Sequence, residues 1–170
     1  IYFAETGAAQ RPSRVIYDRE RSALAEALPG DIDWSRALAG ADWLHVTGIT
    51  PALSASAAEM TLEALRSARD EKVKVSLDLN YRAKLWRYGK SAPEVMAGLA
   101  AQADIMMANE EDCQKSLGLD AGFDPEKISD LVLSRFPQLE AIAITLRQSY
   151  DADHNGWSAV LRSRTGFWTG

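Results

Sequence analysis

The sequence predicts one α/β domain built around a mostly parallel sheet, and two observations carry this prediction. Short strand-like segments alternate with helical segments along most of the chain, and strands that are joined through helices run parallel. The 170 residues are 46% hydrophobic and 25% charged, which suffices for one core of ordinary size in a soluble globular domain. We therefore expect one layered α/β unit.

Five short segments combine apolar residues in the lengths and alternations that are typical of strands. The first four are bounded by helical sequence, as in successive β-α-β units. These predicted strands are residues 42–49, 73–79, 104–108, 140–145 and 157–161.

Capping residues mark the beginnings of three predicted helices. Ser54 or Ser56 precedes a helical apolar pattern that ends at about residue 71. The sequence SAPE at 91–94 places Ser and Glu in the spacing of a capping box. Asp-Pro at 124–125 opens a third helix that runs to about residue 135.

The first twenty residues depart from the alternating pattern. Ile1–Phe3 and Arg14–Tyr17 read as two strands joined by TGAAQRPS, which is the pattern of a β-flap. We therefore expect two parts, β-lid strands over 1–20 and an α/β core over 21–170. The chain begins without Met and ends within the aromatic stretch RTGFWTG, so we expect both parts to be incomplete and the chain to be a central fragment.

Charge and composition argue against several classes of partner. The formal net charge of −5 and the pI near 5.1 disfavour nucleic acid and anionic membrane surfaces. The apolar runs are too short to span a membrane, and the start of the chain lacks a charged-then-apolar targeting pattern. We expect neither a nucleic-acid nor a membrane partner.

The single cysteine and the two histidines point to a reducing compartment without a structural metal. Cys113 has no second cysteine with which to form an intramolecular disulfide, and His45 and His154 lack metal-ligand spacing. We expect a cytoplasmic protein. Cys113 falls in the first turn of a predicted helix, where its pKa could be lowered, but we expect a buried, unreactive thiol.

Polar side chains gather where the second strand of the predicted sheet ends. In VSLDLNYRAKLW, residues Asp78, Asn80 and Arg82 come at and just past the carboxyl end of the strand. Ligands bind beyond the carboxyl ends of parallel strands, so this cluster is a candidate site. The residues alone leave open the alternative that Asp78 and Asn80 satisfy loop backbone and that Arg82 forms a surface ion pair.

The next strand ends in the same way, in MMANEEDC. Asn109 is a favoured helix N-cap, and Glu110, Glu111 and Asp112 would complement the helix dipole. The functional alternative is that this acidic turn orders a hydrated divalent cation beside a nucleotide. Both interpretations fit the sequence.

Five ordered segments resemble the ribokinase-like superfamily of sugar kinases, and most closely the 2-keto-3-deoxygluconate kinases. They are IYFAETGAAQRPSRVIYDRERSA, HVTGITPALS, VSLDLNYRAKLW, ANEEDC and ITLRQSYDADHNGWSA, and together they cover nearly all of the chain. The resemblance implies a three-layer, Rossmann-like fold with a mostly parallel sheet, flanking helices and a small β-strand lid. It also implies ATP-dependent phosphorylation of 2-keto-3-deoxygluconate, with ATP and Mg²⁺ as cofactors.

The resemblance implies that lid and rim residues hold the sugar acid, namely Tyr2, Tyr17, Asp18, Arg19 and Arg82. Arginine binds a carboxylate through two parallel charge-assisted hydrogen bonds, whereas a neutral sugar needs no fixed guanidinium. Arg19 and Arg82 therefore favour a sugar acid over fructose or ribose.

The same resemblance implies a set of nucleotide-facing residues, namely Asn80, Tyr81, Arg82, Asn109, Thr145 and Arg147. It places Asp112 near the metal, although relatives carry Glu at this position of an Asn-x-x-Glu motif. Arg147 is a second departure, because it stands in a stretch where the superfamily has Thr-x-Gly.

Two family motifs do not occur in the sequence. One is Gly-Ala-Gly-Asp, whose Asp is the catalytic base, and the other is an N-terminal Gly-Gly segment that binds sugar. We therefore assign no catalytic residue within these 170 residues.

Three alternatives remain at this point. The chain could serve a kinase for a related sugar such as fructose, or act as a non-catalytic sugar-acid-binding module. A nicotinamide-dependent oxidoreductase is disfavoured because the sequence lacks the glycine fingerprint for a pyrophosphate. Since an isolated two-stranded flap is marginally stable, we also expect a homo-oligomer formed through the lid.

Overall fold

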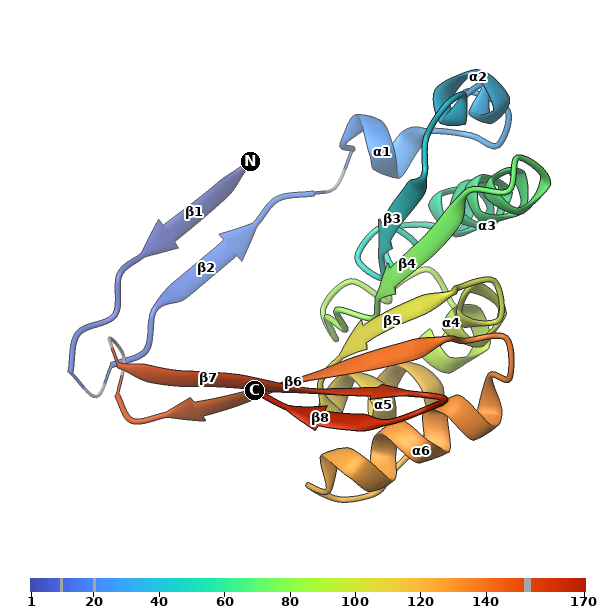
Figure 1. Ribbon diagram of the computed structural model, residues 1–170. Coiled ribbons are helices and arrows are strands. Elements are labelled where there is room, and N and C mark those ends of the chain that lie inside the picture. The colour runs from blue at the N-terminus through green and yellow to red at the C-terminus, as the bar shows by residue number, and fades with distance from the viewer. Residues whose placement is uncertain (10, 20, 152–153) are drawn as a thin grey trace.

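The computed structural model describes residues 1–9, 11–19, 21–151 and 154–170 (Figure 1). Strands and helices alternate after an initial strand pair, as the sequence predicts. In chain order the elements are Tyr2–Glu5 (β1), Arg14–Tyr17 (β2), Ala23–Glu26 (α1), Trp34–Leu38 (α2), Trp43–Thr47 (β3), Ala55–Asp70 (α3), Lys74–Asp78 (β4), Ala92–Ala100 (α4), Ile105–Ala108 (β5), Glu110–Leu117 (α5), Pro125–Arg135 (α6), Ala141–Ser149 (β6), Asn155–Ser163 (β7) and Phe167–Thr169 (β8).

The main sheet has six strands in the order β3-β4-β5-β6-β7-β8. The first four strands are parallel, and β7 and β8 continue the sheet as antiparallel hairpins. The predicted α/β class and mostly parallel sheet are therefore confirmed. The short strand β8 and the short helices α1 and α2 are additions that the sequence patterns did not predict.

The helices α3, α4, α5 and α6 lie on one face of the sheet (Figure 1). Strands β3 to β6 are neighbours in chain order, and right-handed crossovers between strands added in one direction place every connecting helix on the same side. Burial follows this layering, because Val75 and Leu77 are buried whereas Ser76, which points to the other face, is half-exposed. The core therefore lies between the sheet and its helical layer.

The core is apolar and continuous from α3 to β7. Its largest fully buried side chains come from every helix of the layer except α5, and from strands β4, β5 and β6 and the loops beside them: Leu65, Val75, Leu77, Leu79, Met96, Leu99, Met106, Ile128, Val132, Leu139, Ile142 and Ile144.

The predicted helix starts are confirmed by their caps. Ser54, rather than Ser56, caps α3 and accepts the Ala57 N–H at 3.1 Å. The Glu94 carboxylate accepts the Ser91 backbone N–H at 2.6 Å at the start of α4. Asp124 caps α6, where Pro125 is the first helical residue.

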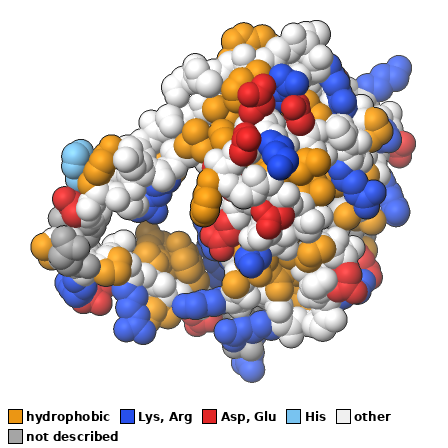
Figure 2. Space-filling model, turned by 90° about the horizontal axis from the view of Figure 1, so that it is seen from below, with side chains coloured by type: hydrophobic (Ala, Val, Ile, Leu, Met, Phe, Trp, Pro, Cys, Tyr) orange, Lys and Arg blue, Asp and Glu red, His pale blue; other side chains and the backbone are white. Residues whose placement is uncertain are grey.

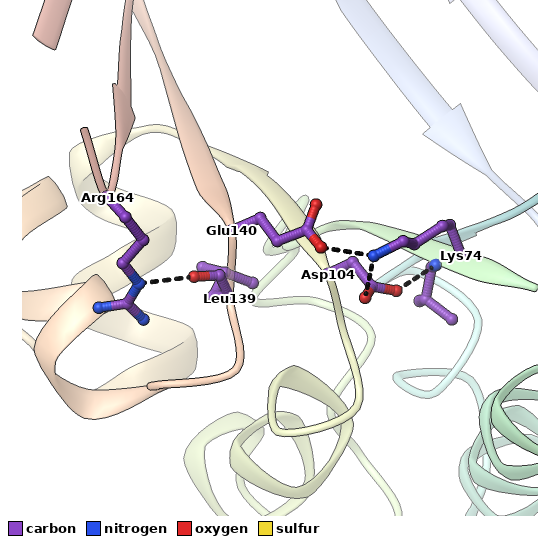
Figure 3. A network of polar contacts seen from close by, with 6 residues as sticks. Lys74, Asp104, Leu139, Glu140 and Arg164 are labelled. Carbon is purple, nitrogen blue, oxygen red and sulfur yellow. Dashed lines mark hydrogen bonds and ion pairs between the residues drawn. The ribbon is translucent and has the colours of Figure 1, made fainter. Parts of the chain in front are cut away.

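An ion-pair network joins the amino ends of three parallel strands (Figure 3). The Lys74 ammonium on β4 contacts Asp104 at 3.2 Å and also Glu140, just before β6. The hydrogen bond with Glu140, followed by that with Asp104, raises the pKa of Lys74. Asp104 also accepts the Val75 N–H at 2.7 Å, so this network fixes the register of β4 to β6 at the edge opposite the carboxyl ends.

Arg164 connects the last hairpin to the helical layer (Figure 3). Its guanidinium donates to the carbonyl oxygens of Leu139 at 3.0 Å, Phe136 at 3.0 Å and Pro137 at 2.8 Å. These carbonyls follow α6, where a cation complements the negative end of the helix dipole. The β7–β8 turn is thereby tied to the end of α6.

The strands β1 and β2 form a separate antiparallel pair, with Tyr2 opposite Tyr17 and Phe3 opposite Ile16. We call residues 1–9 and 11–19 the flap. All eight residues of its two strands are exposed, and in Figure 1 the pair stands away from the main sheet.

None of the helices in the described part of the chain combines the length and apolar character that crossing a membrane requires.

Candidate functional site

The carboxyl ends of β3, β4 and β5 meet at one edge of the sheet, as expected for parallel strands. The Asn80 side-chain amide donates to Thr47 Oγ1 at 3.1 Å, and the Gly48 N–H donates to the Asp78 carbonyl oxygen at 2.8 Å. Asn109 follows β5 at the same edge and caps α5. The structure therefore brings together the strand-end residues that the sequence singled out.

Backbone conformation at this edge depends on two residues. A Cβ on Gly48 would lie 2.1 Å from the Leu79 carbonyl oxygen, so only glycine permits this close approach of the β3 and β4 ends. Asn80 has a φ of 39°, in the left-handed region that asparagine tolerates better than most residues. These two positions set the turn from which Tyr81 and Arg82 project.

Asp112 links this turn to the start of α5. Its Oδ1 accepts the Tyr81 N–H at 2.8 Å, and its Oδ2 accepts the Asn109 N–H at 3.2 Å. In return, Asn109 Oδ1 accepts the Asp112 N–H at 2.7 Å, which completes a capping box. Asp112 is only 6% exposed. The side chain predicted to lie near a metal ion is therefore engaged by two backbone donors.

Two carboxyl groups at this edge have raised pKa values. Burial raises the pKa of Asp78, against the lowering effects of the Asn80 backbone N–H, His45 and Arg82. Burial also raises the pKa of Asp112, against the hydrogen bonds from the Tyr81 and Asn109 backbones. The negative charge of Asp78 raises the pKa of Asp112 further, and Arg82 opposes it. The two carboxyls and the Arg82 guanidinium thus form one electrostatic group.

Arg82 is the exposed cation of this group. Its Nη1 donates to the Tyr81 carbonyl oxygen at 2.7 Å, and it forms no ion pair with any residue that the structure describes. The remaining guanidinium donors are open to an anionic ligand. Among the predicted strand-end residues, Arg82 is the side chain best placed to bind a carboxylate or a phosphate.

Of the two predicted nucleotide-facing residues on β6, Thr145 lies close to the start of α5 and Arg147 lies farther away. Thr145 Oγ1 is 3.4 Å from the Ala108 carbonyl oxygen, at the end of β5, so Thr145 lies beside the α5 cap. Arg147 lies farther along β6, in the part of the β6–β7 hairpin that continues past the last residue paired with β5, Ile144. Its guanidinium donates to Asn155 Oδ1 at 3.1 and 2.9 Å and lies 5.4 Å from the Trp157 ring centroid.

The predicted sugar-binding residues of the flap form a second group. The Tyr2 and Tyr17 ring centroids are 6.0 Å apart, and the Arg19 guanidinium lies 4.5 Å from the Tyr17 ring centroid. Asp18 exchanges backbone hydrogen bonds with Ile1. Among the described residues, Tyr2, Tyr17 and Arg19 contact one another through their rings and the guanidinium, and these contacts do not include the strand-end residues.

An open space separates the two groups. Figure 2 shows that the flap and the β6–β7 hairpin protrude from the body of the molecule and leave an opening beside it. Both cationic and anionic side chains border this opening (Figure 2). A cavity of about 190 Å³ lies between β3 and α3, is lined by Trp34, Thr47 and Met60 among others, and touches this edge at Thr47. The candidate site is therefore an open edge rather than an enclosed pocket.

The described residues contain no group of three or more His, Cys, Asp or Glu side chains arranged to hold a metal ion.

Sequence reasoning missed two residues that build the edge, Thr47 and Gly48. Glycine inside the predicted strand 42–49 signals a close backbone approach, whereas Thr47 had no comparable local signal. Both act through tertiary contacts with the turn after β4.

Comparison with known proteins identifies the class of this fold and site. No family profile matches the chain. A crystal structure of 2-dehydro-3-deoxygluconokinase from Thermotoga maritima superimposes with a TM-score of 0.90 at 40% identity, over 99% of this chain and 52% of that one. A PfkB family carbohydrate kinase from Listeria grayi superimposes with a TM-score of 0.87 at 29% identity, over the same shares. The chain therefore belongs to the PfkB, or ribokinase-like, carbohydrate kinases.

Sequence similarity narrows the comparison to sugar-acid kinases. The 2-dehydro-3-deoxygalactonokinase of Haloferax volcanii is 37% identical over 130 residues, which is 76% of this chain and 40% of that protein. Together with the Thermotoga maritima structure, it places this chain beside the 2-dehydro-3-deoxygluconokinases, also called 2-keto-3-deoxygluconate kinases. The predicted resemblance is confirmed. The chain spans about half the length of these relatives.

Proposed function

We propose that this chain forms the acid-binding rim and part of the nucleotide wall of an ATP-dependent kinase for 2-keto-3-deoxygluconate. The observation that carries the proposal is Arg82, an exposed guanidinium without an ion-pair partner among the described residues, at the carboxyl edge of a parallel sheet. Similarity to kinases named for 2-dehydro-3-deoxy sugar acids supports the substrate class.

The proposed reaction transfers the γ-phosphoryl group of ATP to a hydroxyl of the sugar acid. The hydroxyl oxygen forms a bond to phosphorus, the bond from phosphorus to the ADP oxygen breaks, and the hydroxyl proton passes to a base. We place that base outside these 170 residues. In this scheme Arg82 orients the substrate carboxylate, with Arg19 as its partner on the flap, and Tyr2 and Tyr17 shape the pocket.

The nucleotide side of the proposal rests on the start of α5 and its neighbours. Backbone N–H groups at a helix N-terminus favour a phosphate, and the Asn109 Nδ2 is not used by the capping box. Thr145 lies beside this cap. We propose that Asn109, Thr145 and the Asn80–Arg82 segment face ATP, with Arg147 farther out along the hairpin.

Mg²⁺ accompanies ATP in phosphoryl transfer of this kind and neutralises charge on the phosphates. The described residues fit the ion poorly, because each carboxylate oxygen of Asp112 already accepts a backbone N–H and no further acidic group completes a cluster. The metal role of Asp112 remains a prediction, and we assign no step to the ion.

Kinetics of the protein that carries this sequence test the proposal. Loss of one charge-assisted hydrogen bond costs about 1.5–3 kcal/mol, so Arg82→Ala and Arg19→Ala should each lower kcat/KM for 2-keto-3-deoxygluconate roughly ten- to a hundred-fold. Any activity on fructose should change little, because fructose has no carboxylate. Arg87→Ala, which removes another exposed cation of the same loop, is the matched control. Equal losses on both substrates would contradict carboxylate binding by these arginines.

A further inference from the structure

The Asp112 carboxylate joins two elements that are 31 residues apart in the sequence. One oxygen accepts the Tyr81 N–H and the other accepts the Asn109 N–H. The first donor belongs to the turn after β4, and the second to the cap of its own helix. One buried side chain therefore sets the position of the turn relative to α5.

The Tyr81 N–H has no sheet partner. The last backbone bond from this part of the chain to β5 runs from the Leu79 N–H to the Met107 carbonyl oxygen at 2.9 Å. Beyond Leu79 the backbone leaves the sheet, and Asn80 adopts its positive φ. A buried or half-buried N–H without an acceptor is costly, so Asp112 is the group that holds the turn in place.

The same turn carries the guanidinium that is open to ligand. Arg82 donates to the carbonyl oxygen of Tyr81, whose own N–H is held by Asp112. The backbone of Tyr81 is thus fixed by Asp112 on one side and supports Arg82 on the other. Displacement of Tyr81 would move Arg82 with it.

We propose that Asp112 is a positioning residue that places Arg82 for the sugar-acid carboxylate through its hydrogen bond to the Tyr81 backbone, rather than a ligand of a metal ion. The role of Arg82 in this inference rests on the proposed function. The hydrogen bonds of Asp112 are taken from the structure. The chemistry of the side chain agrees, because a carboxylate supplies two acceptor oxygens, whereas the isosteric asparagine supplies one.

Amide hydrogen exchange of the 170-residue chain, read by nuclear magnetic resonance, tests the hydrogen bonds directly. In Asp112→Ala, which removes both acceptors, exchange of the Tyr81 amide should accelerate at least about tenfold. Asp112→Asn retains the shape and one acceptor oxygen, so the Tyr81 and Asn109 amides should not both keep their protection. Glu111→Gln changes an exposed acid in the same turn and should leave both amides as they are. Unchanged Tyr81 protection in both Asp112 variants would overturn the proposal.

A matched loss of stability separates positioning from general destabilisation. Asp124→Ala removes the N-cap of α6, where Asp124 accepts the Lys127 N–H at 3.0 Å, and should lower the melting temperature to a similar extent. Only Asp112→Ala should shift the Tyr81 and Arg82 resonances. The same shifts in Asp124→Ala would mean that Asp112 acts only on global stability.

Titrations with 2-keto-3-deoxygluconate and with MgCl₂ alone separate this inference from the proposed function and from metal binding. Asp112→Ala should weaken sugar-acid binding about tenfold, whereas Asp124→Ala should leave it unchanged. Saturable Mg²⁺ shifts at Asp112 that disappear in Asp112→Asn would overturn the positioning role. A further outcome is that Asp112→Ala removes Tyr81 amide protection while the Arg82 resonances of the wild-type chain do not shift when the sugar acid is added. That combination would confirm the hydrogen bonds of Asp112 but contradict the proposed function of Arg82. The positioning role of Asp112 would then be rejected as well.

Discussion

The Asn80 side-chain amide donates a hydrogen bond to Thr47 Oγ1 at 3.1 Å, and this bond joins the loop after β4 to the end of β3. Asn80 is the residue whose backbone takes the left-handed conformation at this edge. A side chain that is predicted to face a nucleotide therefore also determines how its own turn is built. The Asn80 side chain therefore stabilises the loop and, in the proposed site, also contacts the ligand.

Removal of this hydrogen bond should destabilise the chain modestly. Thr47→Val keeps the shape of Thr47 and removes its hydroxyl, so the free energy of unfolding should fall by about 0.5–1.5 kcal/mol. Asn80→Gly keeps the positive φ and removes the amide. Urea unfolding of both single variants and the double variant would give the coupling energy. Strictly additive losses would show that the bond contributes nothing to stability.

The 170-residue chain should not transfer phosphate from ATP to a sugar acid at a measurable rate. The sequence lacks the Gly-Ala-Gly-Asp motif, which the family resemblance implies as the source of the base and the anion hole. A coupled assay of ADP release with 2-keto-3-deoxygluconate is the measurement, and an added active kinase verifies the coupling enzymes. Clear turnover by the chain would mean that the base lies within these residues.

The flap should pair with a second copy of the chain. Phe3 and Ile16 are opposite each other on one side of the strand pair and are 66% and 50% exposed. Contiguous exposed apolar groups on an open sheet favour association. Light scattering should give a dimer or larger species, and the double substitution Phe3→Ser with Ile16→Ser should give a monomer. Leu131→Ser, on the exposed part of α6, is the control; a wild-type monomer at high concentration would contradict the prediction.

Cys113 should be unreactive in the folded chain and should make stability depend on pH. Its side chain is fully buried, and burial raises the pKa of its thiol to about 12. The unfolded thiol ionises near pH 9. Between these values only the unfolded chain releases the proton, so stability is lost as the pH rises through this range, by up to about 1.4 kcal/mol per pH unit.

Two measurements check this prediction. A thiol reagent at pH 8 should label Cys113 only as fast as the chain unfolds, and rapid labelling of folded protein would contradict burial. The difference in unfolding free energy between the wild type and Cys113→Ala should decrease from pH 8.5 to 10.5. A constant difference would exclude the thiol as the cause of any pH dependence.

The parts of the fold that depend on local pattern could be predicted from the sequence. Strand alternation around Val75 and Leu77, and the caps Ser54 and Asp124, each act within a few residues of the element that they define. Helix α2 and strand β8 were not predicted, since they span five and three residues and give little periodic signal. The pairing of β8 with Val160 to Arg162 is a tertiary contact.

The location of the candidate site could be predicted, whereas its internal bonding could not. Asn80 and Asn109 follow neighbouring parallel strands, so their meeting at one edge follows from topology alone. The hydrogen bond from Tyr81 to Asp112 depends on where the chain leaves β4 and on the orientation of α5. The resemblance implied a metal role for Asp112, whereas its hydrogen bonds to two backbone N–H groups could be found only in the folded chain.

Gly48 imposes a severe limit on sequence variation at this edge. Every other amino acid carries a Cβ, which would be placed 2.1 Å from the Leu79 carbonyl oxygen, a separation that backbone atoms cannot relieve without moving apart. A library covering all substitutions at this position should therefore yield almost no tolerated variant, even though Gly48 contributes no side chain to any ligand. Its neighbour Thr47 should accept several replacements. Mutational intolerance at Gly48 would thus report on the spacing of two strands, and a screen that equates intolerance with chemistry would assign this glycine to the active site in error.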